Sequence, residues 1–190
     1  MIFNFNTKTE ITHSFEESDF NQLTTVANVA GDKLPTIYGN GYIILRKTAG
    51  TEAQALSVYI DGNTQPFTVT MQGATNVIGN TLRFYFQESI RFTAYSDNVF
   101  YYQTLLTDKE LPKRYDIIQG VSVVDKEFSF TGRGKIIMRN GNLGINHKVE
   151  IDGKSMNVQS NANHYIDILF TESFKCTSSL PLYYIAYIEK

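Results

Sequence analysis

Hydrophobic and polar residues alternate along short stretches of this chain, and turn-forming residues separate one stretch from the next. Between Leu56 and Ile60 every second residue is apolar, which places the apolar side chains on one face of an extended strand. Similar strand-like stretches cover residues 42–45, 82–86 and 90–94, with Gly, Asn and Asp between them. No stretch sustains the i, i+3, i+4 apolar spacing of an amphipathic helix. The pattern predicts an all-β chain.

Residues 14–23 contain the one helix-like segment. Ser14 and Glu17 have the spacing of a capping box, which often starts a helix. A polar turn in contact with water explains the same residues equally well. We interpret Glu16, Glu17 and Asp19 as a solvated acidic face, because short charge runs usually lie in water.

Several blocks of sequence occur twice and in the same order, which indicates an internal duplication. Residues 32–46 match residues 125–139 without a gap. Three further pairs of blocks follow: Val58–Gly62 with Val149–Gly153, Phe86–Thr93 with Phe170–Thr177, and Tyr101–Tyr102 with Tyr183–Tyr184. The spacing between matching blocks shrinks along the chain, so copy one is the longer copy. The additional residues fall between strand-like blocks, where insertions cost little.

The duplication predicts two tandem antiparallel β-sandwich modules, one at residues 24–107 and one at 116–190, joined by a linker at 108–115. Residues 1–23 precede both copies and form either an arm that docks on a neighbouring subunit or the first strand of copy one. The sequence does not fix the strand order. A jelly roll, an immunoglobulin-like sandwich and a small barrel all fit the spacing of the strands.

Two glycine-containing motifs recur in both copies and have structural explanations. Asp61–Gly62 and Asp152–Gly153 each follow an alternating strand, and Asp-Gly supplies the positive φ angles that tight hairpins need. Too few oxygen-bearing residues follow for a calcium loop. The Gly-x-Gly motifs at 39–41 and 132–134 lead into a strand instead of a helix, which favours a bulge or close backbone packing over a nucleotide site.

Composition and charge narrow the possible partners. The chain has 190 residues, of which 42% are hydrophobic and 19% charged, so it is large enough for two packed cores. A formal net charge of -2 leaves no cationic excess to neutralise a phosphate backbone, so we expect no nucleic-acid partner. No apolar run approaches the about 20 residues that cross a bilayer, and the start lacks a signal-peptide pattern. We expect synthesis in the cytoplasm without a signal peptide, and no membrane insertion.

Differences between the copies indicate a tyrosine surface on copy one. At four positions copy one has a tyrosine where copy two has a polar residue, and these positions are compatible with a side chain that points away from the core. The candidate ligand or partner surface consists of Tyr38, Tyr42, Tyr59 and Tyr95. Exposed tyrosines suit stacking on sugars or packing on a protein partner. The alternative is that these rings are scattered over the surface or covered by the other module.

The residues that could carry catalysis lack the spacing that catalysis needs. The three histidines occupy separate segments, as His13, His147 and His164. We interpret the single cysteine, Cys176, as a small buried hydrophobe, because alternation places it on the core face. Glu88 and Glu172 are the most plausible acids, but as equivalent residues they fall one in each module, whereas a glycosidase needs two carboxylates in one cleft. We predict no enzyme activity, no metal and no cofactor.

The repeated order Val-x-Ile-Asp-Gly, then Phe-x-Glu-Ser, then Tyr-Tyr resembles small β modules of accessory tail, baseplate or fibre proteins of tailed bacteriophages that infect Gram-positive bacteria. The likeness covers residues 32–190, and the Asn-, Thr- and Gly-rich composition agrees with it. It implies a non-enzymatic role in building the tail tip or in attaching to cell-wall saccharides, often as a trimer or a larger ring. No saccharide-binding motif can be transferred residue by residue.

Three functions therefore stand as hypotheses. The first is a virion structural or adhesion protein that forms a homo-oligomer, contacts other tail proteins and acts through multivalent contacts. The second is a carbohydrate-binding module that uses the tyrosines of copy one. The third is a glycan hydrolase with Glu88 or Glu172 as its acid.

Overall fold

The computed structural model describes residues 22–49, 54–71, 81–94, 99–107, 113–140, 145–160 and 166–190, and its elements are β-strands apart from one short 3-10 helix. The first half of the chain, here called module one, contains β1 (Gln22–Ala30), η2 (Gly31–Lys33), β2 (Ile37–Tyr38), β3 (Asn40–Ala49), β4 (Gln54–Ile60), β5 (Phe67–Met71), β6 (Thr81–Phe86), β7 (Ser89–Thr93) and β8 (Val99–Thr107). The second half, module two, contains β9 (Tyr115–Val121), β10 (Glu127–Thr131), β11 (Gly134–Asn140), β12 (Ile145–Ile151), β13 (Lys154–Ser160), β14 (Ile166–Phe170), β15 (Ser173–Thr177) and β16 (Leu182–Glu189).

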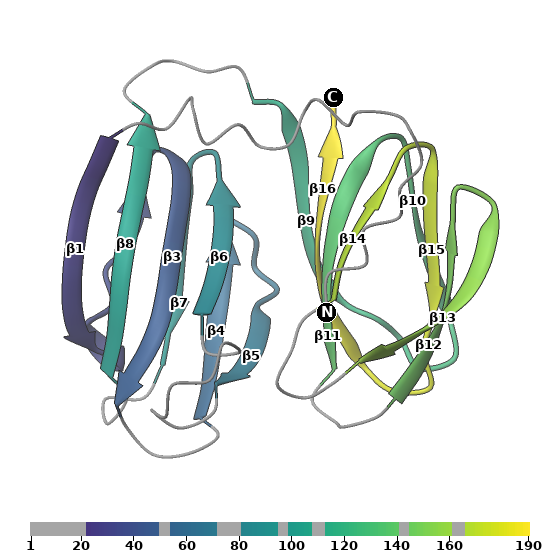
Figure 1. Ribbon diagram of the computed structural model, residues 1–190, viewed down its shortest axis with the longest axis horizontal. Helices are drawn as coiled ribbons and strands as arrows, with labels where there is room; N and C mark the ends of the chain where they lie inside the picture. The colour runs from purple at the N-terminus through teal and green to yellow at the C-terminus, as the bar shows by residue number, and fades with distance from the viewer. Residues whose placement is uncertain are drawn as a thin grey trace.

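Each module is a sandwich of two four-stranded antiparallel sheets (Figure 1). In module one, sheet A has the order β1-β8-β3-β6 and sheet B the order β2-β7-β4-β5. In module two, sheet C has the order β14-β11-β16-β9 and sheet D the order β10-β15-β12-β13, so each strand stands where the strand eight places earlier stands in module one. This interleaved order is that of a jelly roll. The predicted all-β fold with two duplicated sandwich modules is confirmed, and the strand order selects the jelly roll among the alternatives.

The core of each module lies between its two sheets and follows from the alternation in sequence. Leu56, Val58 and Ile60 of β4 are fully buried, while Ser57 and Tyr59 between them face outward and are half-buried. The module-two core is built in the same way, and its buried members include Ile136, Met138, Val149, Phe170, Phe174 and Cys176.

The repeated glycines allow close packing and turns. A Cβ added at Gly41 would lie 2.1 Å from the carbonyl oxygen of Leu105, and one at Gly134 would lie 2.3 Å from that of Tyr187. The close backbone packing expected for the Gly-x-Gly motifs is therefore present in both copies. Asp61 and Asp152 have φ angles of 48° and 49°, as the predicted tight turns require.

The structure bears on the predicted helical segment at 14–23 and on the predicted start of copy one at residue 24. Residues 1–21 lie outside the described residues, and with them most of the predicted helical segment at 14–23. Gln22 and Leu23 are the first residues of β1, because they pair with β8 at Leu106 and Leu105. No helix in the described part of the chain has the length and apolarity to cross a membrane.

Candidate functional site

Each repeated aspartate binds a turn further along the chain, which begins 26 residues after Asp61 and 19 residues after Asp152. The Asp61 carboxylate accepts hydrogen bonds from the backbone N–H groups of residues 87–89 at 2.8–3.1 Å. Asp152 accepts the same bonds from residues 171–173, also at 2.8–3.1 Å. The two repeated blocks, Val-x-Ile-Asp-Gly and Phe-x-Glu-Ser, are thus the two halves of one structural unit in each module.

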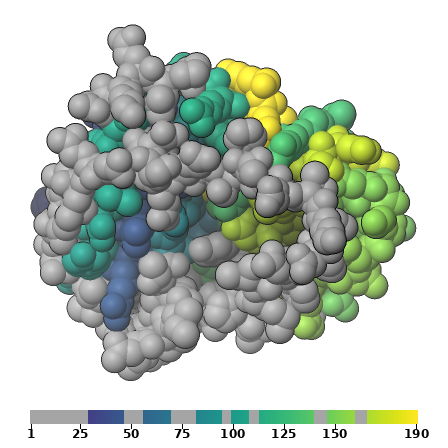
Figure 2. Space-filling view, turned by 45° about the horizontal axis from the view of Figure 1, so that its top comes forward, coloured from purple at the N-terminus to yellow at the C-terminus, as the bar shows by residue number. Residues whose placement is uncertain are grey.

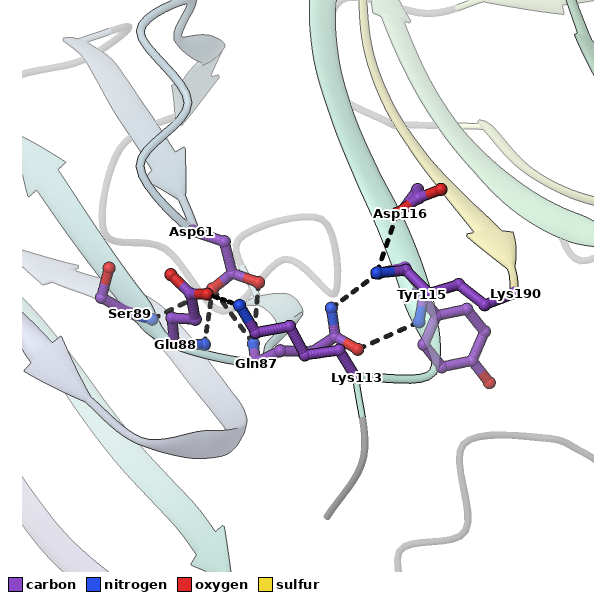
Figure 3. Close-up of polar contacts among 8 residues, drawn as sticks. All are labelled: Asp61, Gln87, Glu88, Ser89, Lys113, Tyr115, Asp116 and Lys190. Atoms are coloured by element: carbon purple, nitrogen blue, oxygen red, sulfur yellow. Dashed lines mark hydrogen bonds and ion pairs between the residues drawn. The ribbon is translucent and has the colours of Figure 1, made fainter. Parts of the chain in front are cut away.

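In module one this aspartate-bound turn faces module two (Figure 3). The side-chain amide of Gln87 forms two hydrogen bonds with the backbone of Tyr115, donating to its carbonyl at 2.8 Å and accepting from its N–H at 3.0 Å. The Lys113 ammonium forms an ion pair with Glu88 in the same turn. These contacts, and those described next, form what we call the junction between the modules.

Two further side-chain amides connect the end of β4 in module one with the edge strand β9 of module two. Gln119 of β9 accepts a hydrogen bond from the N–H of Ile60 at 2.7 Å and donates to the carbonyl of Val58 at 3.0 Å. Asn63 donates in return to the carbonyl of Ile117 at 3.1 Å. Backbone groups on the free side of β4 and of β9 are thereby bonded through side chains, without direct pairing of the two strands.

The edge of β4 is available to Gln119 because the hairpin of copy one is open. Pairing of β4 with β5 stops at Val58 and Phe67, and residues 61–66 connect the strands. In module two the equivalent pairing of β12 with β13 continues to Ile151 and Lys154, which are joined by a two-residue turn. Part of the extra length of copy one therefore creates the place where module two binds.

An aromatic cluster fills the space beside these hydrogen bonds. Tyr85 of β6 contacts Tyr42 on its own sheet, with ring centroids 5.2 Å apart, and contacts Tyr115 and Tyr187 of module two at 5.7 and 6.3 Å. The hydroxyl of Tyr187, fully buried, donates to the carbonyl oxygen of Tyr85 at 3.3 Å. Ile137 and Ile185 of sheet C pack into the same cluster. The hydrophobic core of module one thus continues into module two, and the space-filling view shows the two modules side by side (Figure 2).

The junction changes the electrostatics of one aspartate and not of its counterpart. Burial raises the pKa of Asp61 and outweighs the hydrogen bonds it accepts, which act to lower that pKa. At Asp152 burial also acts to raise the pKa, but its hydrogen bonds from residues 171–173 outweigh it, so the pKa lies below the usual value. Burial in the junction also raises the pKa of Tyr85 to about 12.

The four predicted surface tyrosines differ in exposure, and one of them is outside the described residues. Tyr38 is 74% exposed, as expected. Tyr42 is only 4% exposed, so its predicted exposure is wrong: it does point away from the core of its own sandwich, but Tyr85 and the junction cover that face. Tyr59 is half-buried under the guanidinium of Arg91, which lies 3.9 Å from its ring centroid. Tyr95 lies outside the described residues.

Tyr38, Arg91 and Tyr59 share the outer face of sheet B. Tyr38 pairs with Ser89, two residues before Arg91 on β7, and Arg91 pairs with Tyr59 on β4. The core-facing residues of these strands, such as Ile90, point the other way. This group combines an exposed ring, a cation and a second ring on three adjacent strands, and we call it the sheet B face.

Two of the residues considered for catalysis, Glu88 and His147, have side-chain contacts within the fold. Glu88 and Glu172 lie in equivalent turns, one in each module. His147 is buried and bonds the hydroxyl of Ser178 at 3.0 Å. Cys176 is buried as predicted, and burial raises the pKa of its thiol to about 12. Among the described residues, no group of three or more His, Cys, Asp or Glu side chains is placed to hold a metal ion. The other histidines, His13 and His164, lie outside these residues.

An apolar edge is exposed next to the junction. Six large hydrophobic side chains are exposed in the part of the chain that the structure describes, and four of them fall within seven consecutive positions. These four are Ile118, Val121, Val123 and Val124. They lie on β9 and on the following turn, which is held in place by hydrogen bonds from the N–H groups of Ser122 and Asp125 to the segment at 178–182. The edge is therefore a continuation of the strand that binds module one.

The sequence reasoning missed the amides of the junction and Arg91. Gln119, Asn63 and Gln87 are ordinary polar residues, and only their nearness to an open sheet edge gives them a role. A signal for Asn63 existed, because it lies in the part of the β4–β5 connection that copy two lacks. For Arg91 the signal was the pair of differences at its own position and at Tyr59, where copy two has Lys175 and Glu150.

No protein-family model matches the chain. No curated protein matches its sequence. Among solved structures, a conserved protein of unknown function from Pseudomonas aeruginosa is 14% identical, with 86% of this chain and 78% of that chain covered and a TM-score of 0.37. A cupin 2 conserved barrel domain protein from Leptotrichia buccalis is 11% identical, with 87% and 82% covered and a TM-score of 0.35. A chain of broad bean stain virus is 10% identical, with 100% and 94% covered and a TM-score of 0.36. Likenesses at this level carry no argument about function.

Proposed function

We propose that this protein is a non-enzymatic virion component, a structural or host-adhesion protein of the tail or baseplate of a tailed bacteriophage, that acts through multivalent surface contacts. The observation that carries the proposal is the junction. Three side-chain amides and a shared aromatic cluster join two jelly rolls into one block. A block with fixed surfaces suits a part that repeats in an assembly.

The exposed apolar edge on β9 supports assembly with further copies of this chain. Exposed apolar side chains that lie close together are typical of interaction surfaces, and Val123 and Val124 are exposed neighbours along the chain. The edge continues the strand that already forms one interface, at the junction. Both signs of charge border it, at Asp125, Lys126 and Glu127, so two copies can approach with opposite charges facing each other. We therefore assign the edge to contacts with a second copy.

The test is the absolute mass in solution, from size-exclusion chromatography with light scattering at two protein concentrations. The proposal predicts a trimer or a larger ring, several times the chain mass of 21.6 kDa. Replacing Val123 and Val124 by Ser should shift the protein toward monomer. Leu169→Ser is the control, because Leu169 is equally apolar and exposed but lies on β14. A monomer at both concentrations, or an oligomer that the double variant leaves unchanged, would contradict the proposal.

Saccharide binding remains a second candidate, on a smaller surface than the sequence indicated. With Tyr42 buried, the platform of four tyrosines does not exist as predicted. What favours this function is the placement of Tyr38 and Tyr59 on one face, on either side of Arg91.

A further inference from the structure

We propose that the sheet B face of module one binds a saccharide that carries a carboxylate or phosphate group. Arg91 would contact the anionic group and Tyr38 would stack on the sugar ring. The proposal deepens the adhesion part of the proposed function and rests on it for its biological meaning, while its chemistry comes from three side chains and their counterparts in module two.

Arg91 is held in place by an aromatic ring instead of a carboxylate. Its guanidinium carbon lies 3.9 Å from the centroid of the Tyr59 ring, a cation–π contact that orders a long side chain. Contact with a ring face uses none of the N–H donors of the guanidinium. Arg91 is exposed, and within the described ranges no carboxylate lies at ion-pair distance from it. An ordered, exposed guanidinium suits carboxylate and phosphate groups, which it can bind through two parallel hydrogen bonds.

Tyr38 lies within reach of the same ligand. Its partner across the strands is Ser89, so Tyr38 and Arg91 are diagonal neighbours on one face, about 7–8 Å apart by strand geometry. That spacing is comparable to a sugar ring with a charged substituent. At 74% exposed, the Tyr38 ring offers a flat apolar surface, which suits the C–H face of a sugar.

The equivalent face of module two has an ion pair and a threonine where module one has Arg91, Tyr59 and Tyr38. Lys175 stands at the position of Arg91 and pairs with Glu150, at the position of Tyr59, at 2.7 Å. The position of Tyr38 is occupied by Thr131. On the same sheet scaffold, copy two neutralises its cation and has no exposed ring, whereas copy one keeps both. The ion pair of copy two is enough to keep this face soluble. Copy one has an exposed ring and an unneutralised cation instead, and a ligand would explain both.

The charged neighbours of Arg91 leave room for an anion. Asp61, the nearest acid along β4, directs its carboxylate to the backbone of residues 87–89. Glu88 is paired with Lys113 in the junction. Among the described residues, these two acids close to Arg91 in the strand pairing are therefore engaged elsewhere, which leaves the charge of Arg91 available to an anion.

The experiment measures binding to the full chain by isothermal titration calorimetry, with four probes. They are a galacturonate oligosaccharide, the neutral galactose oligosaccharide of the same length, glucose 6-phosphate and inorganic phosphate. The proposal predicts that the galacturonate oligosaccharide, glucose 6-phosphate or both bind at least tenfold more tightly than the neutral sugar and than phosphate alone. The first and third probes separate a carboxylate ligand from a phosphate ligand. If neither anionic sugar binds more tightly than the neutral sugar and phosphate alone, or if no probe binds, the proposal is overturned.

Matched variants in the two modules localise the site. Arg91→Gln and Tyr38→Ala should each weaken binding of the anionic sugar at least fivefold. Lys175→Gln and Thr131→Ala, at the same positions of module two, should leave it within twofold. All four positions lie on the outer face of a sheet, and circular dichroism checks that the variants fold. Unchanged binding in Arg91→Gln would overturn the assignment.

Failure of this proposal can be told from failure of the proposed function. The light-scattering result depends on the β9 edge and not on Arg91. An oligomer that binds none of the probes overturns the saccharide site and leaves the structural role. A monomer that binds the anionic sugar supports the saccharide site and contradicts the structural role.

Discussion

Asp61 and Asp152 occupy the same position in two copies of one fold, and each accepts hydrogen bonds from three consecutive backbone N–H groups of the same turn. Their pKa values nevertheless shift in opposite directions. The local structure is the same, so the difference comes from what lies outside it. Tyr115 and Lys113 contact the turn at Asp61, whereas Thr171 and Glu172 of the turn at Asp152 are exposed.

The strands next to these turns also differ between the two modules. At the junction, module one has an open β4–β5 connection and the aromatic residues Tyr42 and Tyr85. At the equivalent places, module two has a closed hairpin, an ion pair between Lys135 and Asp167, and the exposed Leu169. A third jelly roll could not bind module two in the way module two binds module one. The two modules therefore differ at the places that form the junction.

The sharpest way to test this contrast is to truncate the same position in both modules. Tyr85 is 5% exposed within the junction, and Leu169 at the equivalent position is 52% exposed. We expect Tyr85→Ala to lower the free energy of unfolding by about 3–5 kcal/mol, because it empties a buried aromatic site. Leu169→Ala should change it by less than about 0.5 kcal/mol. Urea denaturation of both variants measures the difference, and similar losses would show that the junction adds no stability.

Removing the two aspartates compares the buried turn with the exposed one. Asp61→Ala leaves N–H groups of residues 87–89 without their acceptor in a partly buried place, and we expect a loss of about 2–3 kcal/mol. Asp152→Ala leaves the equivalent groups accessible to water, so we expect about 1 kcal/mol. Chemical denaturation reports both values. A larger loss for Asp152→Ala would contradict the burial argument.

His147 provides a pH-dependent difference between the modules, because the equivalent residue of copy one is Leu56. Burial lowers the pKa of His147 below its usual 6.5 in the folded protein. As the pH falls below 6.5, the unfolded chain therefore binds a proton that the folded protein does not, and stability falls by at most about 1.4 kcal/mol per pH unit. His147→Leu should remove this slope. Thermal unfolding between pH 7 and 5 measures it, and an unchanged slope in the variant would assign the effect to other groups.

The smallest effect is expected for the two glutamates of the repeated turns. Glu88 forms an exposed ion pair with Lys113, and such pairs contribute little. We expect Glu88→Gln and Glu172→Gln each to change the free energy of unfolding by less than about 0.5 kcal/mol. The same variants address the hydrolase hypothesis: a glycan-cleaving activity that either substitution abolished would contradict the non-enzymatic role.

The sequence predicted the parts of this fold that depend on local chemistry. Alternation placed Val58 and Ile60 in the core, and Asp-Gly placed the turns at 61–62 and 152–153. The strand order was out of reach, because it depends on pairings between strands distant in sequence, such as β1 with β8. The second role of Asp61, as acceptor for residues 87–89, depends on the same distant pairings.

The candidate surface shows the same limit. Alternation correctly turned Tyr42 away from the core of its own sandwich, but it carries no information on what covers the outer face, and there the junction buries the ring. Tyr38 was predicted exposed and is 74% exposed, on β2 at the edge of sheet B as the described strands form it. The contact of Arg91 with Tyr59 arises from their pairing across β7 and β4, which the sequence did not reveal.

The most direct test of the account is whether the two modules unfold together. Differential scanning calorimetry of the full chain compares the calorimetric enthalpy with the van't Hoff enthalpy. Because the core of module one continues into module two and three amides join their edges, we predict one transition with equal enthalpies. Two separate transitions, or a calorimetric enthalpy about twice the van't Hoff value, would show that the modules are independent and would contradict the junction as the central feature of this protein.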